Sequence, residues 1–214
     1  MKRSGWYCPP NRSPVAAKLF LASSNAGKLA EFRALASGSS ISLDLKLFPN
    51  FDVVPLFEEA APTFAENSAG KALYYSQHTS ELVIADDSGL VVRGLRGRPG
   101  VHSARYAGEN ATSTQRIEKL LREMQGKSGK EREAYFVCVL SVARKNRALA
   151  VITARVDGEI LETQRGAGGF GYDPIFYLPA LRKSFAELNA EEKNQHSHRG
   201  KAFRRLLEVL PGVL

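Results

Sequence analysis

The chain has 214 residues, of which 43% are hydrophobic and 24% are charged, and its formal net charge is +8. These values are typical of one soluble domain with a sizeable core, and no apolar run approaches the roughly 18–20 residues of a membrane span. Two cysteines do not make a disulfide framework or a zinc site, so we expect a cytoplasmic protein. The positive charge favours anionic partners, although solvated helix faces would account for it as well.

Residues 1–17 are rich in Pro, Ser, Arg and Asn and lack the apolar segment of a secretory signal, so we expect a flexible extension there. The remainder, 18–214, contains neither a linker nor an internal repeat. Residues 18–23 (KLFLAS) predict a strand, and residues 28–36 have the apolar spacing of a helix. The loop SNAG between them would offer backbone N–H groups and a helix N-terminus to a phosphate, or form an ordinary tight turn.

The next segment predicts two short strands and a helix. The strands are expected at residues 41–48 and 52–56. Thr63, followed by a glutamate three positions later, predicts the start of a helix that runs to about residue 78. Lys71 lies off the small-residue stripe of that helix, so its side chain would face solvent or a cleft.

The stretch Leu82–Leu90 (LVIADDSGL) runs from four apolar residues into two adjacent carboxylates. It predicts a buried strand that ends in a turn over Asp86, Asp87, Ser88 and Gly89, after which a second strand resumes. Buried carboxylates need a partner or a metal ion, and Mg²⁺ prefers carboxylate oxygens. The alternative interpretation is an ordinary solvated turn.

A long loop and two further strands follow. Residues 94–110 are rich in glycine and arginine, and a loop of this length is typical of a functional segment. After another helix, the apolar run 134–143 predicts a buried central strand, and residues 148–156 predict a second one. Asp157-Gly158 is a hairpin-turn signal, which predicts that residues 160–163 pair back.

The segment 166–174 (GAGGFGYDP) is dense in glycine, which lets the backbone approach a ligand closely. Phe170 and Asp173 suit a flat heterocycle, because the first would stack on the ring and the second would accept hydrogen bonds from ring N–H groups. A glycine-rich turn whose aromatic residues plug the core is the alternative.

Near the C-terminus, Lys193 and Arg199 are six residues apart and would point to different faces of one unbroken helix. Ser197 is a credible second N-cap that would break this helix. His198 and Arg199 would then lie at a positive helix start, where they would meet an anion or a carbonyl oxygen. The alternative is a solvated basic helix face.

Several separated motifs, in this order, closely resemble the inosine/xanthosine triphosphate pyrophosphatase family. They are SSNAGK, TFAEN with the lysine that follows it, ADDSGL, PGVHSARYAGE, GGFGYDP and EKNQHSHRG. The resemblance covers roughly residues 18–210, and His102 stands where a tyrosine is more usual. It implies a single catalytic domain over 18–214, with an elongated α/β fold. A long twisted mixed sheet would carry helices on its faces, two lobes would enclose a central nucleotide cleft, and the protein would be a homodimer.

The resemblance also implies a reaction, the hydrolysis of the non-standard purine triphosphates ITP, dITP and XTP. Water would attack the α-phosphorus and yield the nucleoside monophosphate and pyrophosphate, with Mg²⁺ required, so that deaminated purines leave the nucleotide pool. Asp87 matches the general base. Glu58, Asp86 and Asp87 would hold the metal, and the division of this role between Glu58 and Glu59 is left open. The residues that would contact substrate are Ser23, Ser24, Asn25, Ala26, Gly27, Lys28, Lys71, Ser88, Phe170, Gly171, Tyr172, Asp173, Lys193, His198 and Arg199.

Base selection follows partly from chemistry. Hypoxanthine and xanthine present a 6-oxo acceptor and an N1–H donor, whereas adenine reverses both groups. Arg199 and His198 would donate to the oxygen, and Asp173 would either accept from N1–H or order the loop that does. Guanine presents the same two groups, and the sequence does not identify the residue that would reject it.

Two rival functions predict different partners. A related nucleotide pyrophosphatase with another base preference would show no preference for 6-oxo purines. A basic nucleic-acid-binding protein is disfavoured, because the basic residues are scattered and the aromatic residues are not spaced as a stacking platform. We therefore expect a nucleotide substrate, with no stable nucleic-acid complex and no membrane association.

Overall fold

The computed structural model describes residues 17–24, 26–37, 39, 41–49, 51 and 53–213. The extension expected over residues 1–17 lies outside this range except for Ala17, which begins the first strand. In chain order the elements are β1 (Ala17–Leu21), α1 (Ala26–Ser37), β2 (Leu43–Leu47), α2 (Phe64–Ser76), β3 (Leu82–Val92), α3 (Ser113–Glu123), β4 (Glu133–Arg144), β5 (Arg147–Ile160), β6 (Phe176–Leu178), β7 (Lys183–Ser184), α4 (Ala190–His196) and α5 (His198–Val209). Short 3₁₀ helices occupy Arg93–Leu95, Gly100–Arg105, Gly129–Arg132, Asp173–Ile175, Phe185–Glu187 and Leu210–Gly212.

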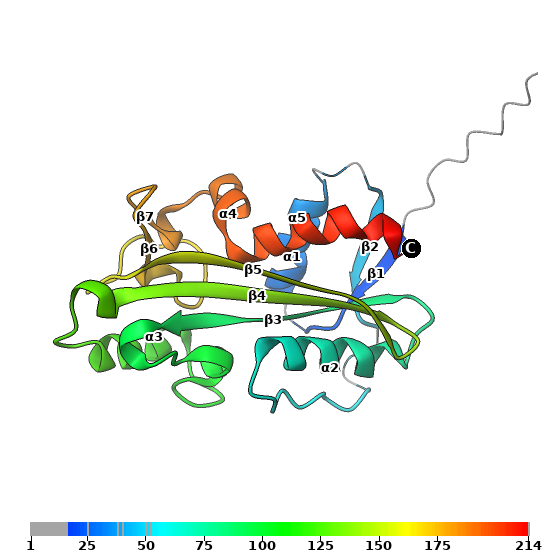
Figure 1. Ribbon diagram of the computed structural model, residues 1–214, viewed down its shortest axis with the longest axis horizontal. Helices are drawn as coiled ribbons and strands as arrows, with labels where there is room; N and C mark the ends of the chain where they lie inside the picture. Colours follow the sequence, from blue (N-terminus) through cyan, green and yellow to red (C-terminus); the bar gives the residue numbers. More distant parts are fainter. Residues whose placement is uncertain are drawn as a thin grey trace, which may run out of the picture.

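The described strands form one mixed sheet in the order β2-β1-β3-β4-β5-β6-β7. β1 pairs in parallel with β2 and β3, whereas every later pairing from β3 to β7 is antiparallel. The long strands β3, β4 and β5 give the molecule its elongated shape (Figure 1). The expected α/β fold with a long mixed sheet is therefore confirmed. Among the described helices, none is both long and apolar enough to cross a bilayer.

Helices cover both faces of this sheet (Figure 1). α1 and α5 pack on one face, where the Phe32 and Phe203 rings lie 5.1 Å apart and meet Ile84. α2 packs on the opposite face, against Val83 and Ala85. Since successive strand residues point to opposite faces, Leu82, Ile84 and Asp86 in the first half of β3 face α1 and α5. The residues between them, Val83 and Ala85, and Asp87 after them face α2.

A third core cluster fills the other end of the molecule. It gathers Phe136 of β4 with Phe176 and Phe185, together with Ile117 and Leu120 of α3. The two ends of the long strands thus have separate packing centres, as expected for two lobes.

The turn predicted over Asp86–Gly89 is wrong, because β3 runs without a break from Leu82 to Val92. Each of these residues pairs with β4, from Asp86 opposite Leu140 to Gly89 opposite Val137. Gly89 serves close packing instead of a turn: a Cβ there would lie 2.5 Å from the Ser103 Oγ and 2.6 Å from the Gly100 carbonyl oxygen. The pairing with β4 therefore overrides a local turn signal.

The hairpin predicted at Asp157-Gly158 is also wrong, since β5 continues to Ile160 and residues 161–163 form no strand. A Cβ at Gly158 would collide with the Tyr177 carbonyl oxygen and the Phe176 ring, so glycine lets β6 approach β5. The actual hairpin turn joins β4 to β5 through Lys145 and Asn146, whose φ angles are 50° and 59°. Two left-handed residues are typical of the turn that fits a twisted hairpin.

The strand predicted at residues 52–56 is wrong for its described part, because residues 53–60 form no helix or strand. Asp52 lies outside the described residues. The strand predicted at 41–48 is confirmed as β2, and the capped helix that follows Thr63 is confirmed as α2. This irregular segment carries Glu58 and Glu59 to the α2 face of the sheet.

Candidate active site

The candidate site lies along the edge of β3 that β1 leaves uncovered. β1 pairs with β3 only from Leu82 to Ile84, whereas β4 continues along the other edge of β3 to Val92. A cavity of about 200 Å³ opens beyond the last residue that β1 covers. Its lining consists of Lys28, Ser88, Gly89, Ser103, Ala104, Arg116, Phe136, Phe170, Gly171, Tyr172, Asp173, Lys193, His198 and Arg199. The structure thus brings together most of the expected substrate contacts from four distant parts of the chain.

Asp86 faces the α1 and α5 side of β3, and cations surround it. Its Oδ2 lies 2.9 Å from Lys28 Nζ and 3.3 Å from Arg199 Nε. The Cys138 thiol of β4 donates to Oδ1 at 3.4 Å. Burial opposes ionisation of this carboxyl, but the two cations outweigh it and hold the pKa well below its usual range. Asp86 is therefore a compensated anion that orients Lys28 and Arg199.

Arg199 joins three elements at the centre of the site. Its Nη1 lies 2.6 Å from Glu31 of α1, and its Nη2 donates to Ser88 Oγ at 3.1 Å. Only 3% of the residue is exposed, so the guanidinium is fixed by these partners and by Asp86. A buried fork of this kind presents its charge with a defined orientation.

The predicted helix break at Ser197 is confirmed. α4 ends at His196, and Ser197 caps α5 by accepting a hydrogen bond from the Gly200 N–H at 3.0 Å. This break lets Lys193 of α4 and Arg199 of α5 line the same cavity, although one helix would have separated them.

The glycine-rich loop places one aromatic ring in solvent and one in the core. Phe170 is 47% exposed, and Lys193 Nζ lies 4.5 Å from the centre of its ring. Tyr172 is buried, and its hydroxyl donates to the Ser103 carbonyl oxygen at 2.9 Å. Asp173 accepts from Lys193 Nζ at 2.6 Å and from the Phe170 N–H at 2.8 Å. Tyr172 therefore plugs the core, as the second interpretation of this loop predicts, and Phe170 lines the cavity, where stacking on a heterocycle stays a prediction.

His198 stacks on Phe136, with ring centres 4.7 Å apart, and on Phe185 behind it. Burial and the neighbouring Arg199 cation lower the pKa of this imidazole well below its usual range, so the ring is neutral. Its Nδ1 is buried without a hydrogen-bond partner among the described residues. A neutral imidazole carries one hydrogen-bond donor and one acceptor, and either could bond to the edge of a heterocycle.

Asp87 faces the opposite side of β3, toward α2, and carries an uncompensated charge. Its Oδ2 is buried and has no hydrogen-bond partner among the described residues. Burial, then the nearby carboxylates of Glu59 and Asp86, raise the pKa of Asp87 to about 7. Lys71 of α2 forms an ion pair with Glu59 at 2.5 Å and lies outside the cavity lining.

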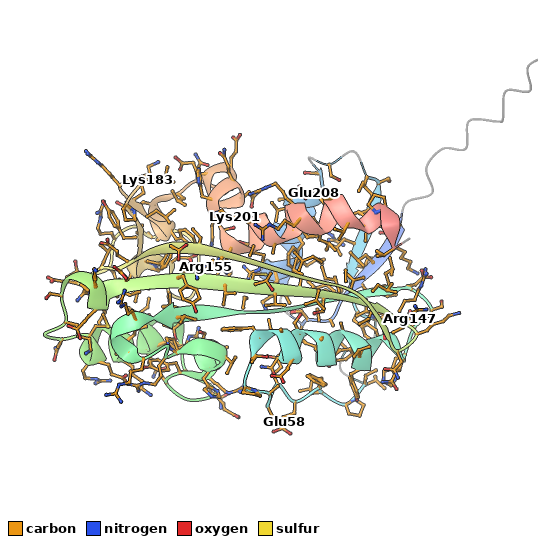
Figure 2. All side chains as sticks on the ribbon, viewed as in Figure 1. Glu58, Arg147, Arg155, Lys183, Lys201 and Glu208 are labelled. Atoms are coloured by element: carbon orange, nitrogen blue, oxygen red, sulfur yellow. The ribbon has the colours of Figure 1, made fainter. Side chains whose placement is uncertain are left out.

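The two adjacent glutamates point in different directions. Glu59 is partly buried between Lys71 and Asp87. Glu58 is exposed and extends away from the molecule in Figure 2. The geometry therefore favours Glu59 as the glutamate that acts beside Asp87.

The donor set near Asp87 suits a hard divalent cation. Within the described residues, no three His, Cys, Asp or Glu side chains converge as a metal cluster. The unpartnered Asp87 oxygen and the Glu59 carboxylate make an acidic pair that lacks full compensation. Mg²⁺ commonly takes one or two protein carboxylates and completes its shell with water and substrate phosphates, so these residues fit it.

The expected phosphate loop joins β1 to α1 at the same sheet edge. Ser23 is buried there, Ser24 and Gly27 are exposed, and Lys28 reaches Asp86. Asn25 and the side chain of Ala26 lie outside the described residues.

Sequence reasoning missed several residues that the site uses. Glu31 binds Arg199 and lies 3.9 Å from Lys193 Nζ. Its position one turn after Lys28 was the available signal, because residues three apart share a helix face. Cys138 and Arg116 gave no such signal, since long-range pairing and packing bring them to the site.

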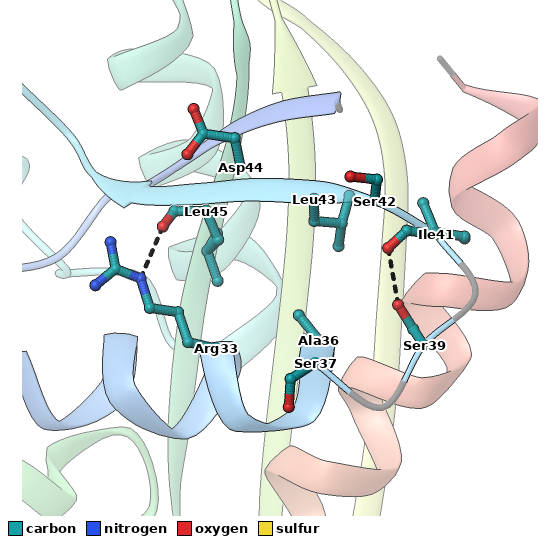
Figure 3. Close-up of a pocket in the computed structure, with 9 residues that line it drawn as sticks. All are labelled: Arg33, Ala36, Ser37, Ser39, Ile41, Ser42, Leu43, Asp44 and Leu45. Carbon is teal, nitrogen blue, oxygen red and sulfur yellow. Dashed lines mark hydrogen bonds between the residues drawn. The ribbon is translucent and has the colours of Figure 1, made fainter. Parts of the chain in front are cut away.

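A second hollow lies at the other end of the sheet, between α1 and the edge strand β2 (Figure 3). Its volume is about 430 Å³, but Arg33 and Asp44 are the only charged side chains among the described residues that line it. Arg33 Nε already donates to the Leu45 carbonyl oxygen at 3.0 Å. This hollow therefore lacks the convergent charged and aromatic groups of the β3 cavity.

Comparisons with known proteins agree with this geometry. The model of the Ham1 family matches residues 19–209. The dITP/XTP pyrophosphatase of Geobacillus kaustophilus is 50% identical over 191 residues, which cover 89% of this chain and 93% of that protein. The dITP/XTP pyrophosphatase of Desulforamulus reducens is 43% identical over 194 residues, or 90% of this chain and 95% of that protein.

Solved structures give the same result. A HAM1 protein from Coxiella burnetii superposes with a TM-score of 0.81 at 40% identity, covering 92% of this chain and 99% of that one. The Ham1 protein of Staphylococcus aureus superposes with a TM-score of 0.78 at 40% identity, covering 91% of this chain and 98% of that one. A family match over most of the chain, with relatives at this identity and a common fold, establishes that the chain belongs to the Ham1 family.

Proposed function

We propose that the protein hydrolyses non-standard purine nucleoside triphosphates (ITP, dITP and XTP) to the nucleoside monophosphate and pyrophosphate. It would thereby remove deaminated purines from the nucleotide pool. The observation that carries this proposal is the β3 edge, where a cationic and aromatic cavity lies next to the uncompensated Asp87. The dITP/XTP pyrophosphatase relatives support it.

The cationic residues would bind the triphosphate. Phosphoryl transfer depends mainly on positioning and charge neutralisation, because the transferred group needs little covalent help. Lys28 and the N–H groups at the start of α1 are proposed to cradle phosphate oxygens. Asp86 would hold Lys28 and Arg199 in place, because both of its oxygens are already engaged.

Asp87 is proposed as the general base that takes a proton from the attacking water. Its buried Oδ2 has no hydrogen-bond partner among the described residues, so this oxygen is available to accept the proton. Glu59 and Asp87 would hold Mg²⁺, and Lys71 would keep the Glu59 carboxylate in place. Bound Mg²⁺ would neutralise charge on the triphosphate. This proposal assigns the metal role to Glu59 in place of Glu58, and it makes Asp86 a positioning residue.

The base would lie in the cavity, with its ring against Phe170. His198 and Arg199 are proposed to donate to the 6-oxo group. Asp173 already accepts from the Phe170 N–H and from Lys193, so it would order the loop and hold Lys193 toward the base. An adenine would present a donor in place of the 6-oxo acceptor to His198 and Arg199, a mismatch of the kind that can discriminate by about 10⁴–10⁵.

The proposed setting is a single catalytic domain over residues 18–214, acting in the cytoplasm as a homodimer with Mg²⁺. A stable complex with nucleic acid is not part of this proposal. The aromatic residues of the site surround one cavity and do not form a row along the surface, which favours a single nucleotide over a strand.

Pyrophosphate release from ITP, dITP, XTP, GTP, ATP and CTP tests the proposal, with Mg²⁺ and with a chelator, for the unsubstituted protein and for Asp87→Asn. We expect Mg²⁺-dependent release from ITP, dITP and XTP and a loss of at least about 10²-fold in the variant. Release of free phosphate in place of pyrophosphate would contradict the proposed reaction. Equal turnover of GTP and ITP would contradict the proposed base preference.

A further inference from the structure

The segment that carries Glu59 has no regular secondary structure, yet several side chains hold it against β3. A carboxylate on such a segment stays in place only if neighbouring groups fix its backbone, because an irregular loop has few hydrogen bonds of its own. The contacts that hold this loop come from α2 and from the 3₁₀ helix Gly100–Arg105.

The first contact is a double hydrogen bond from Asn67 of α2 to Ala61, two residues after Glu59. The Ala61 N–H donates to Asn67 Oδ1 at 2.9 Å, and Asn67 Nδ2 donates to the Ala61 carbonyl oxygen at 3.2 Å. Asn67 is 1% exposed, and its amide also acts on the Asp87 carboxyl. One buried side chain of α2 therefore holds the backbone of the loop that carries Glu59.

The second contact comes from Arg105, whose Nη2 donates to the Glu59 carbonyl oxygen at 2.9 Å. Arg105 belongs to the glycine- and arginine-rich loop, for which sequence reasoning found no specific role. Because Arg105 binds the backbone of Glu59 and Lys71 binds its carboxylate, the same residue is fixed at two points.

We propose that Asn67 and Arg105 are positioning residues that fix Glu59 relative to Asp87 and so preorganise the magnesium site. The inference rests on the proposed function, in which these two carboxylates hold the metal. Residues that orient metal ligands typically contribute about 10–100-fold to metal affinity, so their removal has a measurable effect.

The test is Mn²⁺ binding, measured by the electron paramagnetic resonance signal of free Mn²⁺ without nucleotide. We expect Asn67→Ala and Arg105→Ala to bind Mn²⁺ about 10–100-fold more weakly, and Arg105→Lys, which keeps a donor, to lose less. In assays, the Mg²⁺ concentration that gives half-maximal pyrophosphate release should rise, while KM for dITP at saturating Mg²⁺ stays unchanged.

A matched control separates this role from general stability. Arg33 makes the same kind of bond, from its guanidinium to the Leu45 carbonyl oxygen, in the distant hollow of Figure 3. Arg33→Ala should therefore leave Mn²⁺ affinity unchanged. Asn67 is buried, and if Asn67→Ala fails to fold in circular dichroism melts, the partly exposed Arg105 carries the test alone.

The Mn²⁺-binding results test the positioning role of Asn67 and Arg105 separately from the proposed function. Absence of Mn²⁺ binding by the unsubstituted protein would contradict the proposed metal site and this inference together. If Glu59→Gln weakens Mn²⁺ binding but folded Arg105→Ala does not, the inference is overturned and the proposed function stands.

Discussion

Replacing Asp87 by asparagine should stabilise the metal-free protein while it lowers activity by at least about 10²-fold. The folded protein holds a buried carboxyl that lacks a partner for Oδ2 and whose pKa burial and its acidic neighbours raise from 3.8 to about 7. In the unfolded chain the same group has its ordinary pKa. The folded protein therefore binds a proton more tightly than the unfolded chain does between these two values.

The sign of the pH dependence follows from this difference. Stability falls as pH rises through a range in which the folded state binds more protons, so Asp87 costs the protein stability between about pH 4 and pH 7. The full difference corresponds to about 4 kcal/mol at one pKa unit per 1.36 kcal/mol. Asp87→Asn removes the titrating group and therefore the stability that its ionisation costs. The difference in free energy of unfolding between the variant and the unsubstituted protein should then grow by about 3 kcal/mol from pH 5 to pH 8.

Urea unfolding in a chelator, followed by circular dichroism at pH 5 and pH 8, measures this effect. Asp157→Asn on β5 is the matched control, because that side chain is 68% exposed and its loss should change stability little at either pH. If Asp87→Asn does not raise the free energy of unfolding, or raises it equally at pH 5 and pH 8, the idea that Asp87 is an uncompensated carboxyl is refuted. Adding Mg²⁺ should stabilise the unsubstituted protein more than the variant.

Four further substitutions test other parts of the structure. Glu59→Gln should raise the Mg²⁺ concentration needed for pyrophosphate release, whereas Glu58→Gln should not, and equal effects would contradict the assignment of Glu59. Phe170→Ala should raise KM for dITP about 5–150-fold, because base stacking contributes about 1–3 kcal/mol, while the melting temperature changes little since the ring is 47% exposed. Gly158→Ala should destabilise the protein by about 1–3 kcal/mol in urea unfolding, because its Cβ would collide with the Tyr177 backbone. An unchanged unfolding midpoint would contradict that packing.

Local signals predicted helix boundaries well and strand boundaries poorly. The caps at Thr63 and Ser197 need only the residues around them, and both are confirmed. Whether Asp86–Gly89 turns or continues depends on the apolar strand β4, which lies about 50 positions later in the chain. Gly158 likewise reads as a turn in sequence, because nothing local reveals that β6 packs on it.

The same distinction applies to the site. The residues expected to bind phosphates and a heterocycle could be named from the sequence, and the structure gathers most of them at one cavity. The hydrogen bonds among them could not be predicted, because they join distant parts of the chain. Arg199 and Glu31 are 168 positions apart, and Cys138 and Asp86 are 52 positions apart. The direction of each carboxylate also required the fold, because it depends on the register of β3.

The alternation of Asp86 and Asp87 across β3 has a consequence for redesign. The two aspartates are adjacent in the chain but lie on opposite faces of the strand. Asp86 faces the helices that carry Lys28 and Arg199, whereas Asp87 faces the side that carries Glu59. Under the proposed function, substitutions meant to change the base preference would fall on α5 and the glycine-rich loop, whereas Asp87 and Glu59 lie on the other side of the strand. A single-residue insertion in β3 ahead of Asp86 would turn each aspartate to the opposite face of the strand and so disrupt both groups of contacts.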